Sequence, residues 1–458
     1  TNCVIKGNID TPTNKTDYGI LVYGSDNTIS GNEICNVGYT GINVVGGPWS
    51  DGQGSTISNN SFHDIGIAGS LSYGITIDRS GNNKLNIEGN TFSNFLGGDK
   101  SWAMVVWGQM AEGTHISGHN ISGIYNGISL ASARGVYVTG NNISVPGTAI
   151  RLFYSSWAGP VVDDNVIINN TITGSATGFL INPGTGGAGV IGANNVLAFN
   201  NIYGNTMGAE NLNTVEFDAR NNWWGDVSGP LHPTTNPQGL GNQVSDLILF
   251  DPCLGAPVTG GGALDFDNPS YENGDAGLGV DVGFEGGEEG KVIVTVLGTN
   301  PTGVELFDGS FFDVFVSELG DISEIKVKLY YNEPSAKIAY WFNGTTWVEC
   351  TSQQVVAGAV TVGGVNYDGY VEVTINDSTT PSLANLTGTF FALRGSELYK
   401  GRLTVTITPA DAVTAGAQWS IDDGANWNNS GDYFNFLDAG TYTVTFRDGI
   451  AGYLPPAD

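Results

Sequence analysis

Apolar and polar residues alternate over short stretches in the first half of the chain, and a Gly-Asn or Asn-Asn pair interrupts the alternation at regular intervals. The phrase reads Ile29-Ser-Gly-Asn32-Glu-Ile34 in its clearest form. It recurs with the marker residue at Asn60, Asn90, His119, Asn141, Asn170 and Asn200, and in shortened or degenerate form at Asn8 and Asn222. Successive markers are 22 to 30 residues apart, and no helical pattern lies between them. Such a period predicts a solenoid of β-coils.

The repeated phrase predicts the conformation of one coil. The apolar positions around the pair face inward, because successive side chains of a strand point to opposite faces. Gly and Asn tolerate left-handed backbone, so the pair is expected at a sharp turn. Stacked coils then bring the marker amides to about 4.8 Å from one another, where they bond as a ladder. His119 is expected to take the place of an Asn in that ladder rather than to act in catalysis.

A second repeated strand follows the phrase, as in Tyr18-Gly-Ile-Leu-Val, Tyr73-Gly-Ile-Thr-Ile and Trp102-Ala-Met-Val-Val. Two strands per coil and a variable third segment predict a right-handed parallel β-helix over residues 1–258. This region resembles the pectate-lyase-type β-helix. Its ending, Asn221-Asn-Trp-Trp-Gly-Asp226 with Phe250-Asp-Pro252, resembles the closing motif of such repeats in bacterial and archaeal surface proteins.

Shorter alternating strands separated by turns follow a Gly-rich linker at 256–262, and they predict a β-sandwich over 259–398. Ala339-Tyr-Trp-Phe-Asn-Gly and the segment 376–388 resemble anchor-associated ("choice-of-anchor") domains, which implies an extracellular location. Residues 399–458 resemble a small immunoglobulin-like repeat of bacterial exoproteins that stops before its last strand. The expected fold class is therefore all-β: a right-handed parallel β-helix followed by two β-sandwich domains.

The formal charge of −29, from 45 acidic and 16 basic side chains, argues against nucleic acid and anionic membranes as partners. The sequence has no run of some 18 apolar residues, so direct insertion into a membrane is not predicted. Few charges and abundant Gly, Asn, Ser and Thr are typical of a secreted or cell-surface β-protein. The four cysteines show no metal-ligand spacing, and whether Cys3 and Cys35 form a disulfide is left open.

Sites for chemistry are sparse in this sequence. The motifs of galacturonases are absent, and Asp163-Asp164 is expected to be a turn. An acidic-glycan lyase would need carboxylates for an ion and a basic side chain to remove a proton. The weak candidates for such roles are Asp78, Arg79, Lys100, Arg134 and Arg151. Ordinary solvated side chains are the favoured interpretation, so no catalytic residue is predicted.

The sequence also offers two candidate binding sites. Four tryptophans in or beside the variable segments of the rod offer faces on which sugar rings stack, at Trp49, Trp102, Trp107 and Trp157. An acidic stretch without a basic residue offers oxygen ligands for Ca²⁺, at Asp265, Asp267, Glu272 and Asp275. The alternatives are internal packing for the tryptophans and a solvated loop for the carboxylates.

These patterns favour a non-catalytic extracellular protein with a structural or adhesive role. The lack of a capping element before the first coil and the shortened last repeat lead us to expect assembly with other copies into a filament, sheath or surface layer. The alternative is a polysaccharide lyase or hydrolase, or a glycan binder that does not cleave, acting on acidic glycans along the β-helix.

Overall fold

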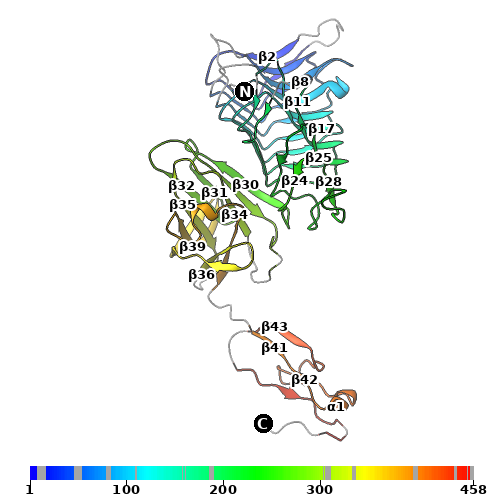
Figure 1. Ribbon diagram of the computed structural model, residues 1–458, viewed down its shortest axis with the longest axis vertical. Helices are drawn as coiled ribbons and strands as arrows, with labels where there is room; N and C mark the ends of the chain where they lie inside the picture. The colour runs from blue at the N-terminus through cyan, green and yellow to red at the C-terminus, as the bar shows by residue number, and fades with distance from the viewer. Residues whose placement is uncertain are drawn as a thin grey trace.

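The structure of the protein is a computed structural model. It describes residues 1–7, 17–45, 54–78, 84–108, 111–156, 158–159, 161–184, 190–302, 304, 311–332, 337–395, 401–437, 441–450 and 452–453. A long stack of parallel strands is followed by antiparallel sheets (Figure 1). The expected all-β fold class is confirmed.

Three parallel sheets, named A, B and C here, form the walls of the rod. Sheet A contains β1 (Val4–Lys6), β4 (Glu33–Cys35), β7 (Ser61–His63), β10 (Thr91–Ser93), β13 (Asn120–Ser122), β16 (Asn142–Ser144), β20 (Thr171–Ile172) and β24 (Asn201–Ile202). Sheet B contains β2 (Tyr18–Val22), β5 (Thr40–Val44), β8 (Ser72–Ile77), β11 (Ser101–Trp107), β14 (Asn126–Ala131), β17 (Thr148–Phe153), β21 (Thr177–Asn182) and β25 (Met207–Asn211). Sheet C contains β3 (Thr28–Ser30), β6 (Thr56–Ser58), β9 (Asn86–Glu88), β12 (Thr114–Ser117), β15 (Val136–Thr139), β19 (Val166–Ile168) and β23 (Val196–Leu197).

Shorter elements complete the rod. A 3-10 turn, η1 (Gly98–Lys100), precedes β11. Three two-stranded parallel pairs join β18 (Val161–Val162) to β22 (Val190–Ile191), β26 (Phe217–Asp218) to β29 (Ile248–Leu249), and β27 (Pro230–Leu231) to β28 (Gly241–Gln243).

The repeated phrase makes two strands rather than one, because its central pair turns the chain from sheet C into sheet A. The residue before each marker from Asn32 to Asn222 has a positive φ, as at Gly31 (68°), Asn59 (55°) and Gly140 (64°). Gly and Asn therefore stand where left-handed backbone is needed. Each regular coil consequently has three strands, where the sequence predicted two and a variable segment.

The inner face of each wall is a column of apolar side chains, one from each coil. In sheet A the column includes Ile34, Phe62 and Phe92, which are at most 1% exposed, and the two phenyl rings stack with centroids 4.9 Å apart. Equivalent columns from sheets B and C meet it in one continuous core. Burial of these side chains, at about 1.5–3 kcal/mol each, is the main source of stability.

The amide ladder predicted from the sequence is present and buried at the turn between sheets C and A. Away from His119, the Nδ2 of a marker donates to the Oδ1 of the marker in the next coil, from Asn32 to Asn60 (2.9 Å) and from Asn60 to Asn90 (3.0 Å). The same pattern links Asn141, Asn170, Asn200 and Asn222.

His119 occupies one position of the ladder, as expected. Its ring Nδ1 accepts from the Asn90 backbone N–H at 2.9 Å, and the backbone N–H of His119 donates to Asn141 Oδ1 at 3.0 Å. Its Nε2 has no hydrogen bond, and burial lowers the pKa of the imidazole to about 4. The ring is therefore neutral at physiological pH.

Two antiparallel sheets follow the rod. The first contains β30 (Val258–Leu264), β33 (Lys291–Leu297), β34 (Phe311–Glu318), β40 (Phe390–Gly395), β36 (Lys337–Phe342) and β37 (Trp347–Glu349). The second contains β31 (Ser270–Asn273), β32 (Leu278–Phe284), β35 (Ile322–Tyr331), β39 (Val365–Ile375) and β38 (Gln353–Val362). A 3-10 turn, η2 (Leu383–Asn385), precedes β40. Residues of both sheets share one apolar core, which is compatible with the predicted sandwich.

The rod contacts the first antiparallel sheet along the turn between sheets C and A. Phe199 has a positive φ of 56°, unusual for an aromatic residue, and its buried ring meets Phe315 of β34 at 5.6 Å. One coil earlier, Asn169 lies so close to Gly261 of β30 that a Cβ there would be 2.5 Å from its Nδ2. A shared apolar cluster therefore holds the rod and this sheet together.

A carboxyl group is buried on the side of the first sheet that faces the rod. Asp313 alternates along β34 with Phe311 and Phe315, which both belong to the shared cluster. It is 1% exposed, neither carboxyl oxygen has a hydrogen bond, and the Oγ1 of its cross-strand neighbour Thr295 also lacks one. Burial raises the pKa of Asp313 well above its usual range.

The last part of the described chain holds short elements: β41 (Gly401–Thr404), α1 (Ala410–Thr414), β42 (Trp419–Ser420), β43 (Tyr433–Leu437) and β44 (Thr445–Phe446). Figure 1 places them at the far end from the first coil. The boundaries proposed from the sequence at 258 and 398 remain predictions. Within the described residues, no helix has the length and hydropathy needed to cross a membrane.

Cys3 and Cys35 do not form a disulfide in the structure. The register of β1 on β4 pairs Val4 with Glu33 and Lys6 with Cys35. Cys3 therefore lies beside the start of β4, about three residues, or 10 Å, from Cys35 along the sheet. This separation exceeds the reach of a disulfide.

Candidate functional site

The outer face of sheet B carries aromatic side chains that follow the axis of the rod. Tyr18 and Tyr39 meet edge to face at 5.6 Å, and Tyr39 meets Tyr73 at 5.4 Å. Tyr73 is in register with Trp102 of the next coil. Aromatic groups thus succeed one another over four coils on a single face.

Arg151 of β17 ends this series with a guanidinium held between two aromatic faces. Its Cζ lies 4.3 Å from the ring centroid of Trp102 and 4.4 Å from that of Phe153. Both distances are well within the range of cation–π attraction. Nε and a terminal nitrogen donate to Ser129 Oγ at 3.2 and 3.0 Å.

Small side chains on the intervening strand make room for this arrangement. Ser129 and Ala131 of β14 lie in register between Arg151 and Phe153 on one side and Val105 and Trp107 on the other. Larger residues there would fill the space over β14 that the guanidinium occupies.

No carboxylate pairs with Arg151 in the part of the chain that the structure describes. The only hydrogen bonds of its guanidinium found there go to Ser129, and burial lowers the pKa of Arg151 to about 10. At neutral pH the group is still almost entirely protonated. A partly buried cation without a counter-ion favours an anionic ligand.

Two of the other predicted basic candidates have partners outside this cluster. Lys100, exposed at the end of η1, donates to the Gly69 carbonyl at 2.9 Å, and Arg134 pairs with Asp164 at 2.6 Å. Asp78 lies just after β8, and Arg79 is outside the described residues. The structure therefore places Lys100 and Arg134 apart from Arg151.

Two of the four tryptophans proposed for sugar contact can be placed. Trp102 is 8% exposed and Trp107 is half-buried, and both belong to an apolar cluster on the outer face of sheet B. Trp49 and Trp157 lie outside the described residues. Their role in glycan contact remains a prediction.

Three of the four carboxylates proposed for Ca²⁺ have protein partners in the structure. Asp265 accepts from the Tyr137 hydroxyl of the rod at 2.8 Å, and Asp267 pairs with Lys84 at 2.7 Å. Glu272 accepts from the Tyr330 hydroxyl at 3.5 Å. The calcium site, with Asp275 as its fourth ligand, remains a prediction.

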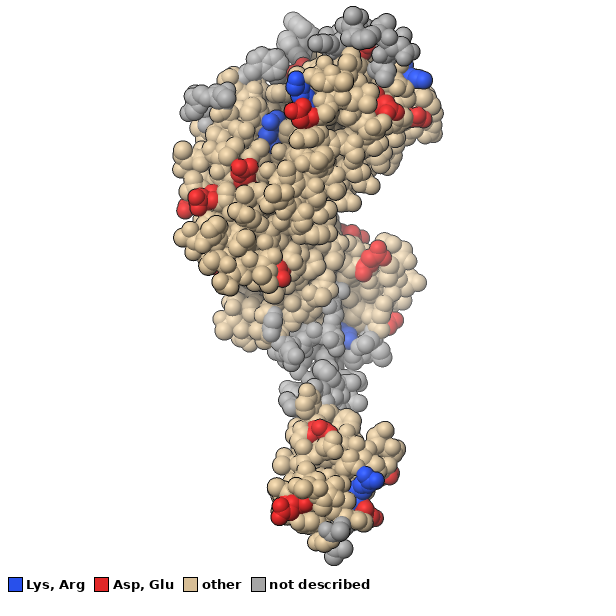
Figure 2. Space-filling model, turned by 90° about the vertical axis from the view of Figure 1, so that its right-hand side faces the viewer, with Lys and Arg blue, Asp and Glu red and all other residues tan. Residues whose placement is uncertain are grey.

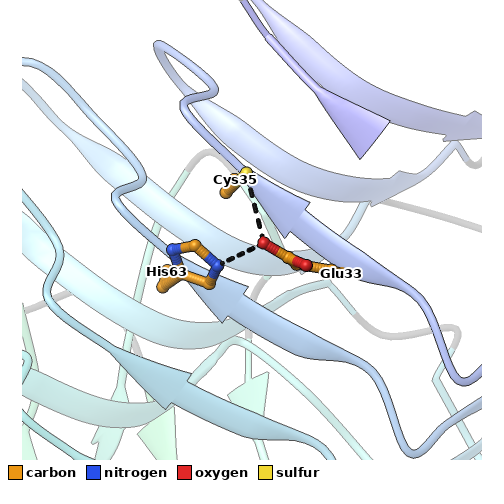
Figure 3. A group of neighbouring side chains, drawn as sticks. All are labelled: Glu33, Cys35 and His63. Atoms are coloured by element: carbon orange, nitrogen blue, oxygen red, sulfur yellow. Dashed lines mark hydrogen bonds and ion pairs between the residues drawn. The ribbon is translucent and has the colours of Figure 1, made fainter. Parts of the chain in front are cut away.

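Another group of ligand side chains lies on the outer face of sheet A (Figure 3). One ligand atom each from Glu33, Cys35 and His63 lie within 4.8 Å of one another. Hydrogen bonds that the imidazole donates to the Asp64 carboxylate and to the Glu33 carboxylate raise the pKa of His63, while burial opposes this shift. Burial and then the Glu33 carboxylate raise the pKa of the Cys35 thiol, while Lys6 lowers it.

A cavity of about 680 Å³ lies where the rod meets the first antiparallel sheet. Its volume suits a small ligand. The charged side chains on its walls already have ion-pair partners: Arg220 pairs with Asp218 at 2.6 Å, Lys291 with Glu318 at 2.9 Å, and Asp164 with Arg134 at 2.6 Å. Because these charges are neutralised, the cavity offers weaker attraction to a charged ligand than the Arg151 cluster does.

The sequence contained a signal for the aromatic series. Tyr18, Tyr73 and Trp102 open the second repeated strand of their coils, so they share one column of the predicted sheet. Ser129 and Phe153 carried no comparable signal, because only the register of β14 and β17 shows that they meet Arg151.

Charged groups are sparse on the face of the molecule shown in Figure 2, in keeping with the low content of Lys, Arg, Asp and Glu.

One comparison with known proteins agrees with the architecture of the first coils. A family model described as a right-handed β-helix region matches residues 1–101. Two similar solved structures are a tailspike protein double mutant of Escherichia coli bacteriophage HK620 in complex with a pentasaccharide, and a tailspike protein of Acinetobacter baumannii bacteriophage Fri1, a capsular polysaccharide depolymerase. The first is 9% identical, covers 83% of this chain and 71% of its own, and has a TM-score of 0.35. The second is 10% identical, covers 85% and 73%, and has a TM-score of 0.27.

No curated protein matches the chain.

Proposed function

We propose that the chain binds a carboxylate-bearing polysaccharide along the outer face of sheet B and does not cleave it. The observation that supports this most is the guanidinium of Arg151, held between Trp102 and Phe153 without a carboxylate partner in the described part of the chain. This adopts the glycan-binding alternative from the sequence and keeps an extracellular, adhesive role.

The chemistry of the face suits an acidic sugar chain. A guanidinium offers two parallel N–H donors that match a carboxylate, and aromatic faces receive the apolar faces of sugar rings. The series from Tyr18 to Arg151 runs along the rod, so an extended polymer meets several of these groups at once.

Cleavage is not part of the proposal, because Arg151 is a poor proton acceptor. A pKa of about 10 leaves it protonated at neutral pH, whereas a general base must be free of its proton. Self-association into a filament or layer remains a separate prediction, which light scattering over a range of protein concentrations tests.

Replacement of Arg151 with glutamine is expected to weaken binding of a uronate oligosaccharide about tenfold or more. A hydrogen bond to a charged group contributes about 1.5–3 kcal/mol, and 1.4 kcal/mol corresponds to a factor of ten in Kd. Titration calorimetry with the uronate oligosaccharide and with its carboxyl-reduced counterpart measures the effect. The carboxyl-reduced sugar should bind the wild type and Arg151→Gln equally.

Arg220→Gln is the matched control, since Arg220 already pairs with Asp218. It should leave the Kd unchanged. Equal affinity of the wild type and Arg151→Gln for the uronate would contradict the role of Arg151 in binding the carboxylate. New ultraviolet absorbance from unsaturated sugar products would contradict binding without cleavage.

A further inference from the structure

Three potential metal ligands converge on sheet A because stacked coils place them in neighbouring register. Cys35 of β4 is the direct partner of His63 on β7, and Glu33 precedes Cys35 by two residues on the same face of the strand. Glu33 Oε1 lies 3.0 Å from His63 Nε2 and 3.9 Å from Cys35 Sγ. Figure 3 shows the three side chains directed toward one another.

The imidazole of His63 has a carboxylate at both of its nitrogens. Nδ1 lies 2.8 Å from Asp64 Oδ2, and Nε2 lies 3.0 Å from Glu33 Oε1. A neutral imidazole carries only one N–H, so one nitrogen would direct its lone pair at a carboxylate. The space between Nε2, the Glu33 carboxylate and the Cys35 sulfur therefore favours a positive charge, either a proton or a metal ion.

The donor set selects among metals. Thiolate, imidazole and carboxylate together suit a borderline-soft divalent ion, and zinc takes all three in tetrahedral sites. Zinc–ligand bonds of 2.0–2.3 Å imply separations of about 3.3–3.7 Å between tetrahedral ligands. The observed 3.0 and 3.9 Å lie on either side of this range, and the third separation, between Cys35 and His63, is within 4.8 Å, so binding requires the ligands to shift by about 1 Å or less.

The groups around the three ligands also match a metal site. Asp64 at Nδ1 would fix the His63 tautomer with a free Nε2, the arrangement typical of a zinc-bound histidine. Asn36 Nδ2 lies 3.6 Å from the Cys35 sulfur, where it can donate to a thiolate. Lys6, the register neighbour of Cys35, adds a positive charge that favours the thiolate.

We propose that Glu33, Cys35 and His63 bind a zinc ion that joins β4 to β7, with water as the fourth ligand. The thiol proton of Cys35 passes to solvent on binding, and the charges of one thiolate and one carboxylate balance the ion. This site is independent of the glycan face on sheet B.

Cobalt(II) is the probe, because a cobalt–thiolate bond gives sulfur-to-metal charge-transfer absorption and tetrahedral cobalt gives intense visible bands. The full chain is used with Cys3→Ser, which removes an exposed thiol outside the site. Titration should give both absorptions at one equivalent, and zinc should displace them.

Matched variants assign the ligands. Cys35→Ser should abolish the charge-transfer band, and His63→Gln should weaken binding at least tenfold. Asp64→Asn, which changes only the group that positions His63, should weaken it about 10–100-fold while the band remains. Cys253→Ser should behave as the parent.

Metal-free thermal unfolding shows whether each variant keeps its fold. A parent chain without the charge-transfer band, or a band that persists in Cys35→Ser or disappears in Cys253→Ser, would overturn the proposal.

Discussion

Replacement of Asn170 with alanine is expected to lower the free energy of unfolding of the rod by about 3–5 kcal/mol, because it leaves at least two buried polar groups without partners at about 1–3 kcal/mol each. The Asn170 side chain is fully buried. Its Oδ1 accepts from the N–H and the Nδ2 of Asn141, and its Nδ2 donates to the carbonyls of Val138 and Ile168 and to Asn200 Oδ1. Thermal unfolding should show a fall in Tm of about 10 °C or more.

Asn142→Ala is the matched control, because Asn142 lies beside ladder residue Asn141 but is exposed on the outer face of β16. Its effect should stay within about 0.5 kcal/mol. Similar Tm values for Asn170→Ala and Asn142→Ala would show that the ladder contributes little to stability.

Replacement of Asp313 with asparagine is expected to stabilise the protein at neutral pH and to have little effect near pH 4. Burial without a hydrogen bond raises the pKa of Asp313 in the folded chain above the value of 3.8 for an unperturbed carboxyl group. A group with a raised folded pKa binds its proton more tightly when folded, so its stability contribution is lost as the pH rises from about 4 toward the folded pKa. The loss amounts to about 1.4 kcal/mol per pH unit in that window. The Tm difference between variant and wild type should therefore grow from pH 4 to pH 8.

Asp281→Asn provides a control with the opposite sign. Asp281 accepts from Lys328 and Ser270, and these partners lower the pKa of its carboxyl despite the desolvation that opposes them. Its contribution is present at neutral pH and is lost as the pH falls, so Asp281→Asn should destabilise near pH 7 and converge on the wild type in acid. A Tm difference for Asp313→Asn that is the same at pH 4 and pH 8 would refute a buried, titrating carboxyl.

The conformation of a coil could be predicted from the sequence, because the same local pattern of residues recurs in each coil. Left-handed turns at residues such as Gly31 and Asn59, inward apolar columns and the amide ladder all follow from one phrase. Even the place of His119 in the ladder could be predicted, since it depends only on the spacing of markers.

Contacts between distant segments could not be predicted in this way. Phe199 breaks the Gly/Asn rule at its turn, and only the structure shows that its ring packs on Phe315, 116 residues later. The sequence favoured a solvated side chain for Arg151, and only the structure shows that its guanidinium packs on the Trp102 ring. The spacing of residues along the chain also did not reveal His63 as a neighbour of Cys35. The two residues are 28 positions apart in the sequence and meet only because their strands are paired.

The ladder has a mechanical consequence, because its bonds run along the axis of the rod. A pull on the two ends of the rod loads every junction between coils in series, and the junction with the fewest bonds yields first. On either side of His119 the described structure has backbone-to-side-chain bonds to Asn90 and Asn141 but no amide-to-amide bond like those elsewhere in the ladder. We therefore expect the ladder to open first next to His119 when the rod is stretched, and single-molecule force measurements would locate this opening.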